Sequence, residues 1–128
     1  MVEQPIIVGI VDDDPMVRDS LEYLLLSEGF QTEQYASAEA FIIAAKTSKA
    51  ACLLVDIQLG DITGLELARQ LTSIDCIFPI LFMSGSSDTM AYQQAMDFGC
   101  VAFLHKPFPA NQLVESIMKA TLSLPGSQ

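Results

Sequence analysis

Residues 8–15 read VGIVDDDP, a short apolar run that ends in three carboxylates and a proline. The apolar, β-branched part has the composition of a buried strand. Asp14 can cap a following helix, and Pro15 suits the first helical position, where a missing N–H costs little. Two like charges about 4 Å apart repel by roughly 4 kcal/mol at an effective dielectric near 20. The carboxylates of Asp12 and Asp13 therefore need a cation, a helix N-terminus or solvent to offset their repulsion.

The change from an apolar run to polar residues recurs along the chain. Strands are predicted at residues 6–11, 31–36, 51–56, 79–84 and 101–105. Helices are predicted from Pro15 to a stop at Gly29, and at residues 38–45, 65–71, 88–99 and 110–122. Three of the strands are almost wholly apolar. This alternation predicts an α/β fold in which helices cover both faces of a five-stranded parallel sheet.

Helical spacing also assigns the residues that face the core. They are Val17, Leu21, Leu24 and Leu25; Phe41 and Ala44; Leu65, Ala68 and Leu71; and Leu113, Ile117 and Ala120.

The chain has 128 residues, which suits a single domain. We expect its core to span about residues 6–122, with residues 123–128 as a tail or a linker stub. Cys52, Cys76 and Cys100 match neither a zinc-site nor a disulfide spacing, so we expect reduced thiols.

Charge and hydropathy narrow the classes of partner. Sixteen acidic residues against six basic ones give a formal charge of −10, which argues against direct binding of nucleic acid or of an anionic membrane. This charge suits bound cations or basic partners. The N-terminus lacks the features of a signal peptide, and no apolar run reaches the ~18 residues of a membrane span, so we expect a cytoplasmic location.

Polar residues follow four of the predicted strands. Asp12 and Asp13 follow the first strand, Asp56 closes the third, Ser84 closes the fourth and Lys106 follows the fifth. In open parallel sheets, ligands bind beyond the carboxyl ends of the strands, so these side chains should meet at one edge. The carboxylates offer the oxygen ligands that Mg²⁺ prefers. With a hydroxyl and an amine beside them, they suit phosphoryl transfer to a carboxylate.

Over about residues 6–122, the chain resembles the receiver domains of two-component response regulators. VDDDPMVRDSLEYLLLSEGF and YASAEAFI are similar to the nitrogen-fixation-regulator type. The resemblance implies the flavodoxin-like strand order 2-1-3-4-5. It also implies Mg²⁺-dependent phosphoryl transfer from a histidine kinase or phosphotransfer protein, with Mn²⁺ as a substitute cofactor, followed by autodephosphorylation. The surface formed by the fourth helix, fifth strand and fifth helix would then signal to a downstream effector or to an output domain.

The resemblance assigns the phosphoacceptor to Asp56 in LLVDIQLGDITG. It assigns the metal ligands to Asp12, Asp13, Asp56 and the backbone carbonyl of Gln58. Lys106 in HKPF would contact the phosphoryl group, and the bond from Lys106 to the following proline is cis in the family.

Further positions follow from the same resemblance. Ser84 in FMSGSSD is the switch hydroxyl, and Phe103 is the switch aromatic. Gly64 matches the family glycine in the loop after the phosphoacceptor. Gly60 departs from the family, which usually has proline there, and we expect this loop to be more mobile as a result. Asp61 in the same loop is expected to be solvated.

The expected output surface has little positive charge. Residues 88–97 contain no Lys or Arg, and the fifth helix contains only Lys119. Receivers that dimerise through interlocking salt bridges need several basic residues there. If this chain forms a phosphorylation-dependent dimer, we expect a more apolar contact through Met90, Tyr92 and Phe108.

Two other classes of protein share parts of this pattern. A pseudo-receiver would bind partners without being phosphorylated. A haloacid-dehalogenase-type phosphatase also uses a strand-end Asp with a second Asp two residues on, which Asp12 and Asp14 imitate. However, Met16 stands where that motif has Thr or Val, and the chain lacks its late acidic metal motif. His105 invites a phosphohistidine hypothesis, but receivers are phosphorylated on Asp, so we interpret it as a half-exposed strand residue.

Overall fold

The computed structural model describes residues 4–85 and 89–122. The strands are β1 (Ile7–Val11), β2 (Gln31–Tyr35), β3 (Cys52–Asp56), β4 (Ile80–Ser84) and β5 (Ala102–His105). The helices are α1 (Pro15–Ser27), α2 (Ala38–Ala44), α3 (Gly64–Ser73), α4 (Thr89–Phe98) and α5 (Ala110–Leu122). All predicted elements are present, with ends shifted by one or two residues. The predicted helix start at residue 88 and the predicted tail at residues 123–128 lie outside the described residues.

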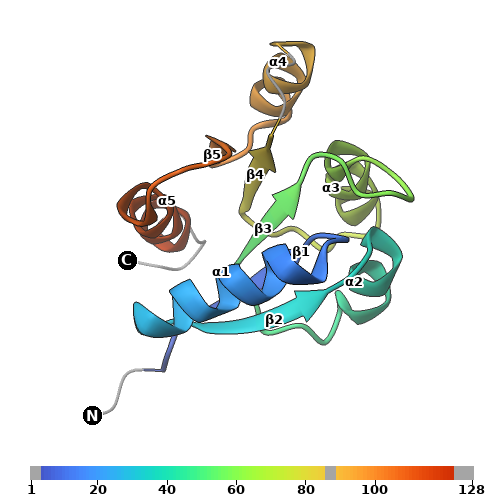
Figure 1. Cartoon of the computed structure of the whole chain (residues 1–128). Helices are drawn as coiled ribbons and strands as arrows, with labels where there is room; N and C mark the ends of the chain where they lie inside the picture. Colours follow the sequence, from blue (N-terminus) through green and yellow to red (C-terminus); the bar gives the residue numbers. More distant parts are fainter. Residues whose placement is uncertain (1–3, 86–88, 123–128) are drawn as a thin grey trace.

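The strands form one parallel sheet in the order β2-β1-β3-β4-β5. Both the parallel α/β class and the 2-1-3-4-5 order are confirmed. β2, which is largely polar, and β5, which is short, form the two edges of the sheet. α1 and α5 cover one face, whereas α2, α3 and α4 cover the other (Figure 1).

The two faces bury separate apolar clusters. Under α1 and α5, the buried side chains include Leu21, Leu25, Leu113, Ile117 and Ala120. Under α2, α3 and α4, they include Phe41, Leu65, Leu67, Ala68, Leu71 and Ala95. Most of the inward positions predicted from helical spacing are therefore buried. The exceptions are Val17, Leu24 and Ala44, which are only half-buried.

Short polar side chains fix where three helices begin. Asp14 accepts a hydrogen bond from the N–H of Met16, so the predicted cap of α1 is present. Ser37 caps α2 in the same way. Thr63 caps α3 through the N–H of Glu66. Each cap satisfies a donor that the first helical turn leaves unpaired, an effect of about 1 kcal/mol.

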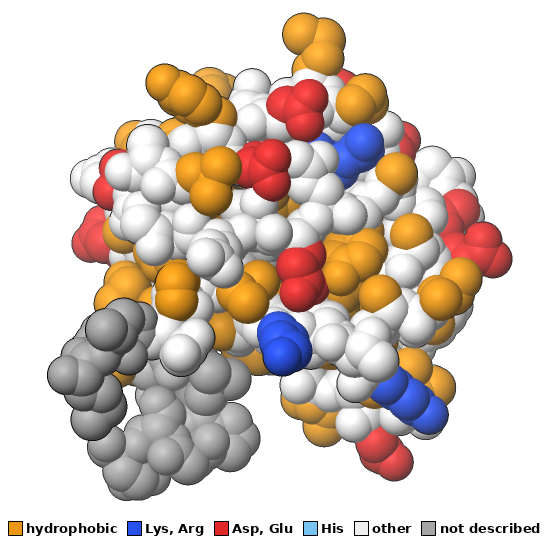
Figure 2. Space-filling view, turned by 90° about the horizontal axis from the view of Figure 1, so that it is seen from below, with side chains coloured by type: hydrophobic (Ala, Val, Ile, Leu, Met, Phe, Trp, Pro, Cys, Tyr) orange, Lys and Arg blue, Asp and Glu red, His pale blue; other side chains and the backbone are white. Residues whose placement is uncertain are grey.

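Carboxylates are scattered among apolar side chains over the face seen in Figure 2, with Lys and Arg at few points. This distribution agrees with the excess of acidic residues in the composition. Within the described part of the chain, no helix has both the length and the apolarity to cross a membrane.

Candidate phosphoacceptor site

The three neighbouring carboxylates after β1 have three different environments. Asp12 is only 1% exposed, and its Oδ1 accepts a hydrogen bond from the N–H of Asp14 at 2.9 Å. The side chain of Asp14 serves as the cap of α1. Asp13, between them, is exposed. The repulsion expected from the sequence is therefore reduced by directing the carboxylates to separate partners.

Lys106 joins two carboxylates that come from different strands. Its Nζ lies 3.0 Å from Oδ2 of Asp56 and 3.5 Å from Oδ2 of Asp12. Asp56 ends β3, Asp12 follows β1 and Lys106 follows β5, so the carboxyl ends of the strands bring these groups together. The side chains of Lys106 and Asp56 are 28% and 14% exposed, so the ion pair is only partly open to solvent.

Burial and charge act in opposite directions on these groups. Burial raises the pKa of Asp12, the N–H of Asp14 and the charge of Lys106 lower it, and Asp56 raises it again; the net shift is upward. Burial alone would lower the pKa of Lys106. Its hydrogen bonds and ion pairs with Asp56 and Asp12 outweigh burial, so that pKa is raised. Lys106 is therefore a fixed positive charge at neutral pH.

The loop after Asp56 is built around that carboxylate. Oδ1 of Asp56 accepts a hydrogen bond from the N–H of Gln58 at 2.8 Å. The N–H of Gly64 donates to the carbonyl of Ile57 at 2.8 Å, and Gln58 pairs with Thr63, which closes the loop. A Cβ at Gly64 would lie 2.5 Å from the backbone oxygen of Asp56. Only glycine fits so close an approach, which gives a physical reason for the family glycine.

Gly60 and Asp61 give this loop features that the sequence did not reveal. Gly60 has a φ of 42°, which proline cannot adopt because its ring fixes φ near about −65°. Asp61 is exposed, as expected, but its Oδ2 also accepts the N–H of Glu39 in α2 at 3.4 Å. Burial raises the pKa of Asp61, but backbone N–H groups of the loop and of α2 together hold it below its ordinary value. The loop is therefore linked to α2, a contact that the sequence did not reveal.

The oxygen donors near Lys106 have the chemistry that Mg²⁺ prefers. The Gly60 loop lies against Asp13, because a Cβ at Gly60 would be 3.3 Å from Oδ2 of Asp13. Carboxylates from two strand ends and carbonyl groups of this loop are thus available on one edge of the sheet. Across residues 4–85 and 89–122, no three His, Cys, Asp or Glu side chains are gathered closely enough to hold a metal. The donor types fit a magnesium ion.

The two predicted switch residues lie on neighbouring strands. Ser84 is buried at the end of β4, and its carbonyl accepts the N–H of Lys106 at 2.8 Å. Phe103 on β5 is half-buried, and its ring meets that of Tyr92 edge-on at a centroid distance of 5.2 Å. His105 is exposed, beyond the half-exposure expected, and its ring lies 5.1 Å from Phe103. The backbone thus links Ser84 to Lys106, while Phe103 belongs to an aromatic group on the α4 side.

Sequence reasoning did not single out Arg18, which folds back from α1 over the loop after β1. Its Nη1 donates to the backbone carbonyl of Asp12 at 2.7 Å, and its Nε donates to Oε1 of Gln34 at 3.1 Å. The sequence signal was a lone basic residue one helical turn after an acidic triplet. The Lys106–Pro107 peptide bond is cis, as the resemblance implied.

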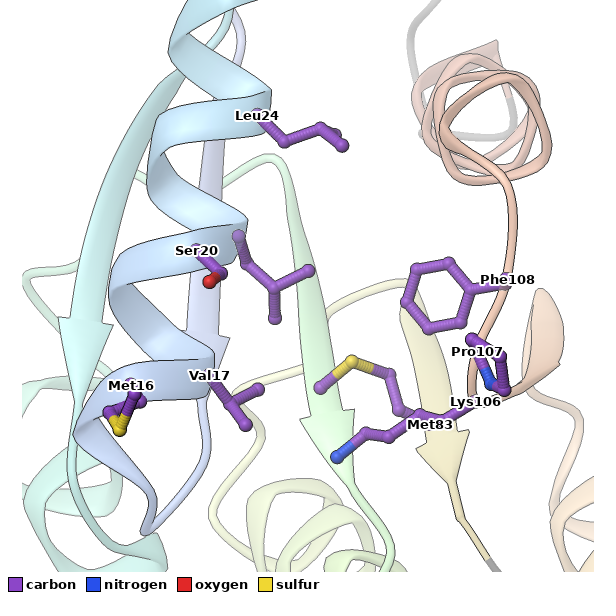
Figure 3. A pocket seen from close by; sticks show the side chains of 9 residues that line it. Met16, Val17, Ser20, Leu24, Met83, Lys106, Pro107 and Phe108 are labelled. Carbon is purple, nitrogen blue, oxygen red and sulfur yellow. The ribbon is translucent and has the colours of Figure 1, made fainter.

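A groove of about 440 Å³ runs beside the site between α1 and the segment that leads into α5. Figure 3 shows Met16, Val17 and Leu24 on the α1 side, with Pro107 and Phe108 across from them. The side chain of Lys106 lines the groove near the end of β3. The groove is therefore apolar along most of its length and charged where it meets the carboxylates.

Comparisons with known proteins agree with the fold. Residues 8–118 match the family model of the response regulator receiver domain. The transcriptional regulatory protein FixJ of Bradyrhizobium diazoefficiens is 36% identical over 113 residues, which are 88% of this chain and 55% of that protein. The response regulator protein TodT of Pseudomonas putida is 33% identical over 128 residues, all of this chain and 56% of that protein.

A solved structure, the crystal structure of FixJ-N, superposes with a TM-score of 0.89 at 34% identity. The match covers 95% of this chain and 98% of that one. The chain spans about half the length of the curated relatives it matches.

Proposed function

Because the chain belongs to the response regulator receiver domains of two-component systems, we propose that it accepts a phosphoryl group on Asp56 from a histidine kinase or phosphotransfer protein. The observation that carries this proposal is the position of the Lys106 ammonium, 3.0 Å from Asp56 and 3.5 Å from Asp12. A phosphoacceptor beside a fixed positive charge can hold the negative oxygens of an incoming phosphoryl group.

The transfer replaces one bond to phosphorus by another. A carboxylate oxygen of Asp56 attacks phosphorus as the P–N bond to the donor imidazole breaks, which leaves an aspartyl phosphate and a free histidine. Lys106 stabilises the phosphoryl oxygens, together with backbone N–H groups near Ser84. The protein contributes mainly positioning and charge, which supply most of the acceleration in phosphoryl transfer.

Asp12, Asp13, Asp56 and the carbonyl of Gln58 are the groups that would hold Mg²⁺, with Mn²⁺ as a substitute. The bound ion would neutralise negative charge on the phosphoryl oxygens. Asp13 is exposed and free to turn towards such an ion, whereas Asp12 is held by Lys106 and by the N–H of Asp14.

The output of the domain would follow from the new negative charge on Asp56. Ser84 would move towards the phosphoryl oxygens, and Phe103 would turn into the space that Ser84 leaves. Because Phe103 contacts Tyr92 of α4, this movement would change the surface of α4, β5 and α5. It is a shift between two packings of one fold. Autodephosphorylation would then reset the domain.

Two partners would act on different faces. The phosphodonor must place its phosphohistidine next to Asp56, and the apolar groove lined by Lys106, Met16 and Phe108 gives it a surface beside that position. On the output side, the α4-β5-α5 surface would meet a downstream effector protein or an output domain. The net charge of −10 argues against direct contact of this domain with nucleic acid.

A second candidate, a binding module that is never phosphorylated, is favoured by one observation. Among the described residues, no three carboxylate, His or Cys side chains are already gathered as a metal site. Such a module would use the same surfaces without being phosphorylated. The experiment that follows separates the two.

Phosphoryl uptake from acetyl phosphate is the direct test. The intact mass of the wild-type protein should rise by one phosphoryl group when Mg²⁺ is present and stay unchanged in excess chelator. Asp56→Asn should gain no mass in either condition, because its amide is not nucleophilic. Asp61→Asn is the matched control, since it makes the same change at an exposed position in the loop that follows Asp56. No adduct on the wild type, with Mg²⁺ binding shown separately, would favour the unphosphorylated module.

A further inference from the structure

We propose that Arg18 is a positioning residue for the metal site, which holds the peptide group between Asp12 and Asp13 in the orientation that cation binding needs. The role rests on the proposed function, because it concerns the ligands assigned to Mg²⁺ there. The role is supported by the contacts that Arg18 makes with main-chain groups of the loop after β1, which contains Asp12, Asp13 and Asp14.

Arg18 is bound to both ends of that loop. Its backbone N–H donates to the carbonyl of Asp14 at 3.0 Å, as part of the first turn of α1. Its side chain returns to the carbonyl of Asp12, which accepts from Nη1 at 2.7 Å. Arg18 is therefore tied to Asp14 by a backbone hydrogen bond and to Asp12 by a charge-assisted hydrogen bond. Charge-assisted bonds are roughly twice as strong as neutral ones.

The guanidinium is itself held in place from the side of β2. Oε1 of Gln34 accepts from Nε of Arg18 at 3.1 Å, and Nε2 of Gln34 donates to Asp19 at 3.3 Å. These contacts orient the planar fork of the guanidinium, which a lysine ammonium could not reproduce with two fixed partners. Arg18 thus connects β2, α1 and the end of β1.

The N–H and the carboxylate of Asp12 have partners of their own, so its carbonyl is available to Arg18. The N–H of Asp12 donates to the carbonyl of Tyr35 at 3.2 Å, and the side chain meets Asp14 and Lys106. With the Asp12 carbonyl held as well, the peptide plane that leads into Asp13 is fixed at its carbonyl edge, and the plane before it is fixed through the N–H of Asp12. Asp13 is exposed, so its backbone is what determines where its carboxylate can reach.

Electrostatics and positioning predict opposite effects when Arg18 is removed. The chain already carries a formal charge of −10, so the loss of one more positive charge should strengthen the attraction for a cation. The loss of a positioning contact should instead weaken binding. Groups that orient metal ligands typically change affinity by 10- to 100-fold, and for this backbone contact we expect about tenfold.

The experiment is a Mg²⁺ titration by calorimetry, with the carbonyl carbon-13 shift of Asp12 measured by NMR in the same samples. Arg18→Ala should bind Mg²⁺ about tenfold more weakly and change the Asp12 carbonyl shift. Arg18→Lys keeps the charge and the stem, serves if Arg18→Ala does not fold, and should show an intermediate loss. Gln34→Ala, which frees the guanidinium on one side only, should show a smaller loss.

Arg69→Ala is the matched control, because Arg69 is an exposed arginine on α3 and its removal changes the charge equally. It should bind Mg²⁺ as tightly as the wild type or slightly more tightly. Wild-type affinity or better in folded Arg18→Ala and Arg18→Lys would overturn the positioning role while leaving the proposed function intact. Failure of the wild type itself to bind Mg²⁺ would overturn both.

Discussion

Helices α3 and α4 have the same length, 10 residues each, but they are attached to the sheet in different ways. α3 buries half of its residues, namely Gly64, Leu65, Leu67, Ala68 and Leu71. α4 buries only Ala95, while Met90, Tyr92 and Met96 are 68%, 41% and 44% exposed. The two neighbouring helices therefore differ in how much apolar contact a movement would break.

This difference separates a fixed part of the site from a part suited to move. α3 begins at Gly64, whose backbone closes the loop after Asp56, so a displaced α3 would disturb the proposed phosphoacceptor. α4 lies beside Phe103, the predicted switch residue, and a shift of α4 exposes little surface that was buried. Segments with few buried apolar contacts open at low free-energy cost. In the proposed function, phosphorylation would act on α4, the helix whose displacement costs less free energy.

The largest effect is expected from shortening a buried side chain of α3. Leu67→Ala should lower the free energy of unfolding by about 2–5 kcal/mol, because Leu67 is fully buried and the change leaves a cavity. Met90→Ala on α4 removes a mostly exposed side chain and should change the free energy of unfolding by less than about 0.5 kcal/mol. Urea unfolding of both variants measures the contrast. Equal losses would show that α4 is packed as firmly as α3.

A smaller effect is expected where α3 meets Asp56, the proposed phosphoacceptor. Gly64→Ala places a methyl group 2.5 Å from the backbone oxygen of Asp56, and should lower stability by about 1–3 kcal/mol through forced backbone shifts. It should also slow phosphoryl uptake from acetyl phosphate. Gly85→Ala, after β4, is the control for stability, since a Cβ there meets none of the described residues within 4 Å. Normal uptake by a folded Gly64→Ala protein would contradict the close fit.

The smallest effect concerns the two helices in the unmodified protein. Backbone amides in the middle of α4 should exchange with deuterium about tenfold or more faster than those in the middle of α3, which corresponds to about 1.4 kcal/mol in opening free energy. Native-state hydrogen exchange by NMR at fixed pH would measure this. Slower exchange in α4 than in α3 would reverse the assignment of the fixed and movable helices.

Most of the fold could be predicted because apolar runs and helical spacing reflect burial directly. The spacing of Leu113, Ile117 and Ala120 places them on one stripe, and all three are buried. The strand ends also indicated which polar groups would meet, since parallel strands place their carboxyl ends on one edge of the sheet. The contacts of Lys106 with Asp12 and Asp56 follow from that rule.

Contacts made by side chains that fold back over loops could not be predicted. Whether Arg18 points to solvent or to the Asp12 carbonyl depends on the backbone path of the turn, which composition does not determine. The same holds for Asp61, whose carboxylate reaches α2 only because the loop carries it there. The rotation of α4 that places Tyr92 against Phe103 was also hidden, because that helix has too few buried residues to define a stripe.

The two edges of the sheet bear on how the protein behaves when it is crowded. An unpaired strand edge is a template for another chain, and long apolar edges promote aggregation. β2 presents glutamine, threonine and glutamate at its edge, while β5 is only four residues long. The apolar strands β1, β3 and β4 lie between them. The strands most prone to form intermolecular sheets are therefore shielded on both sides by strands poorly suited to recruit another molecule.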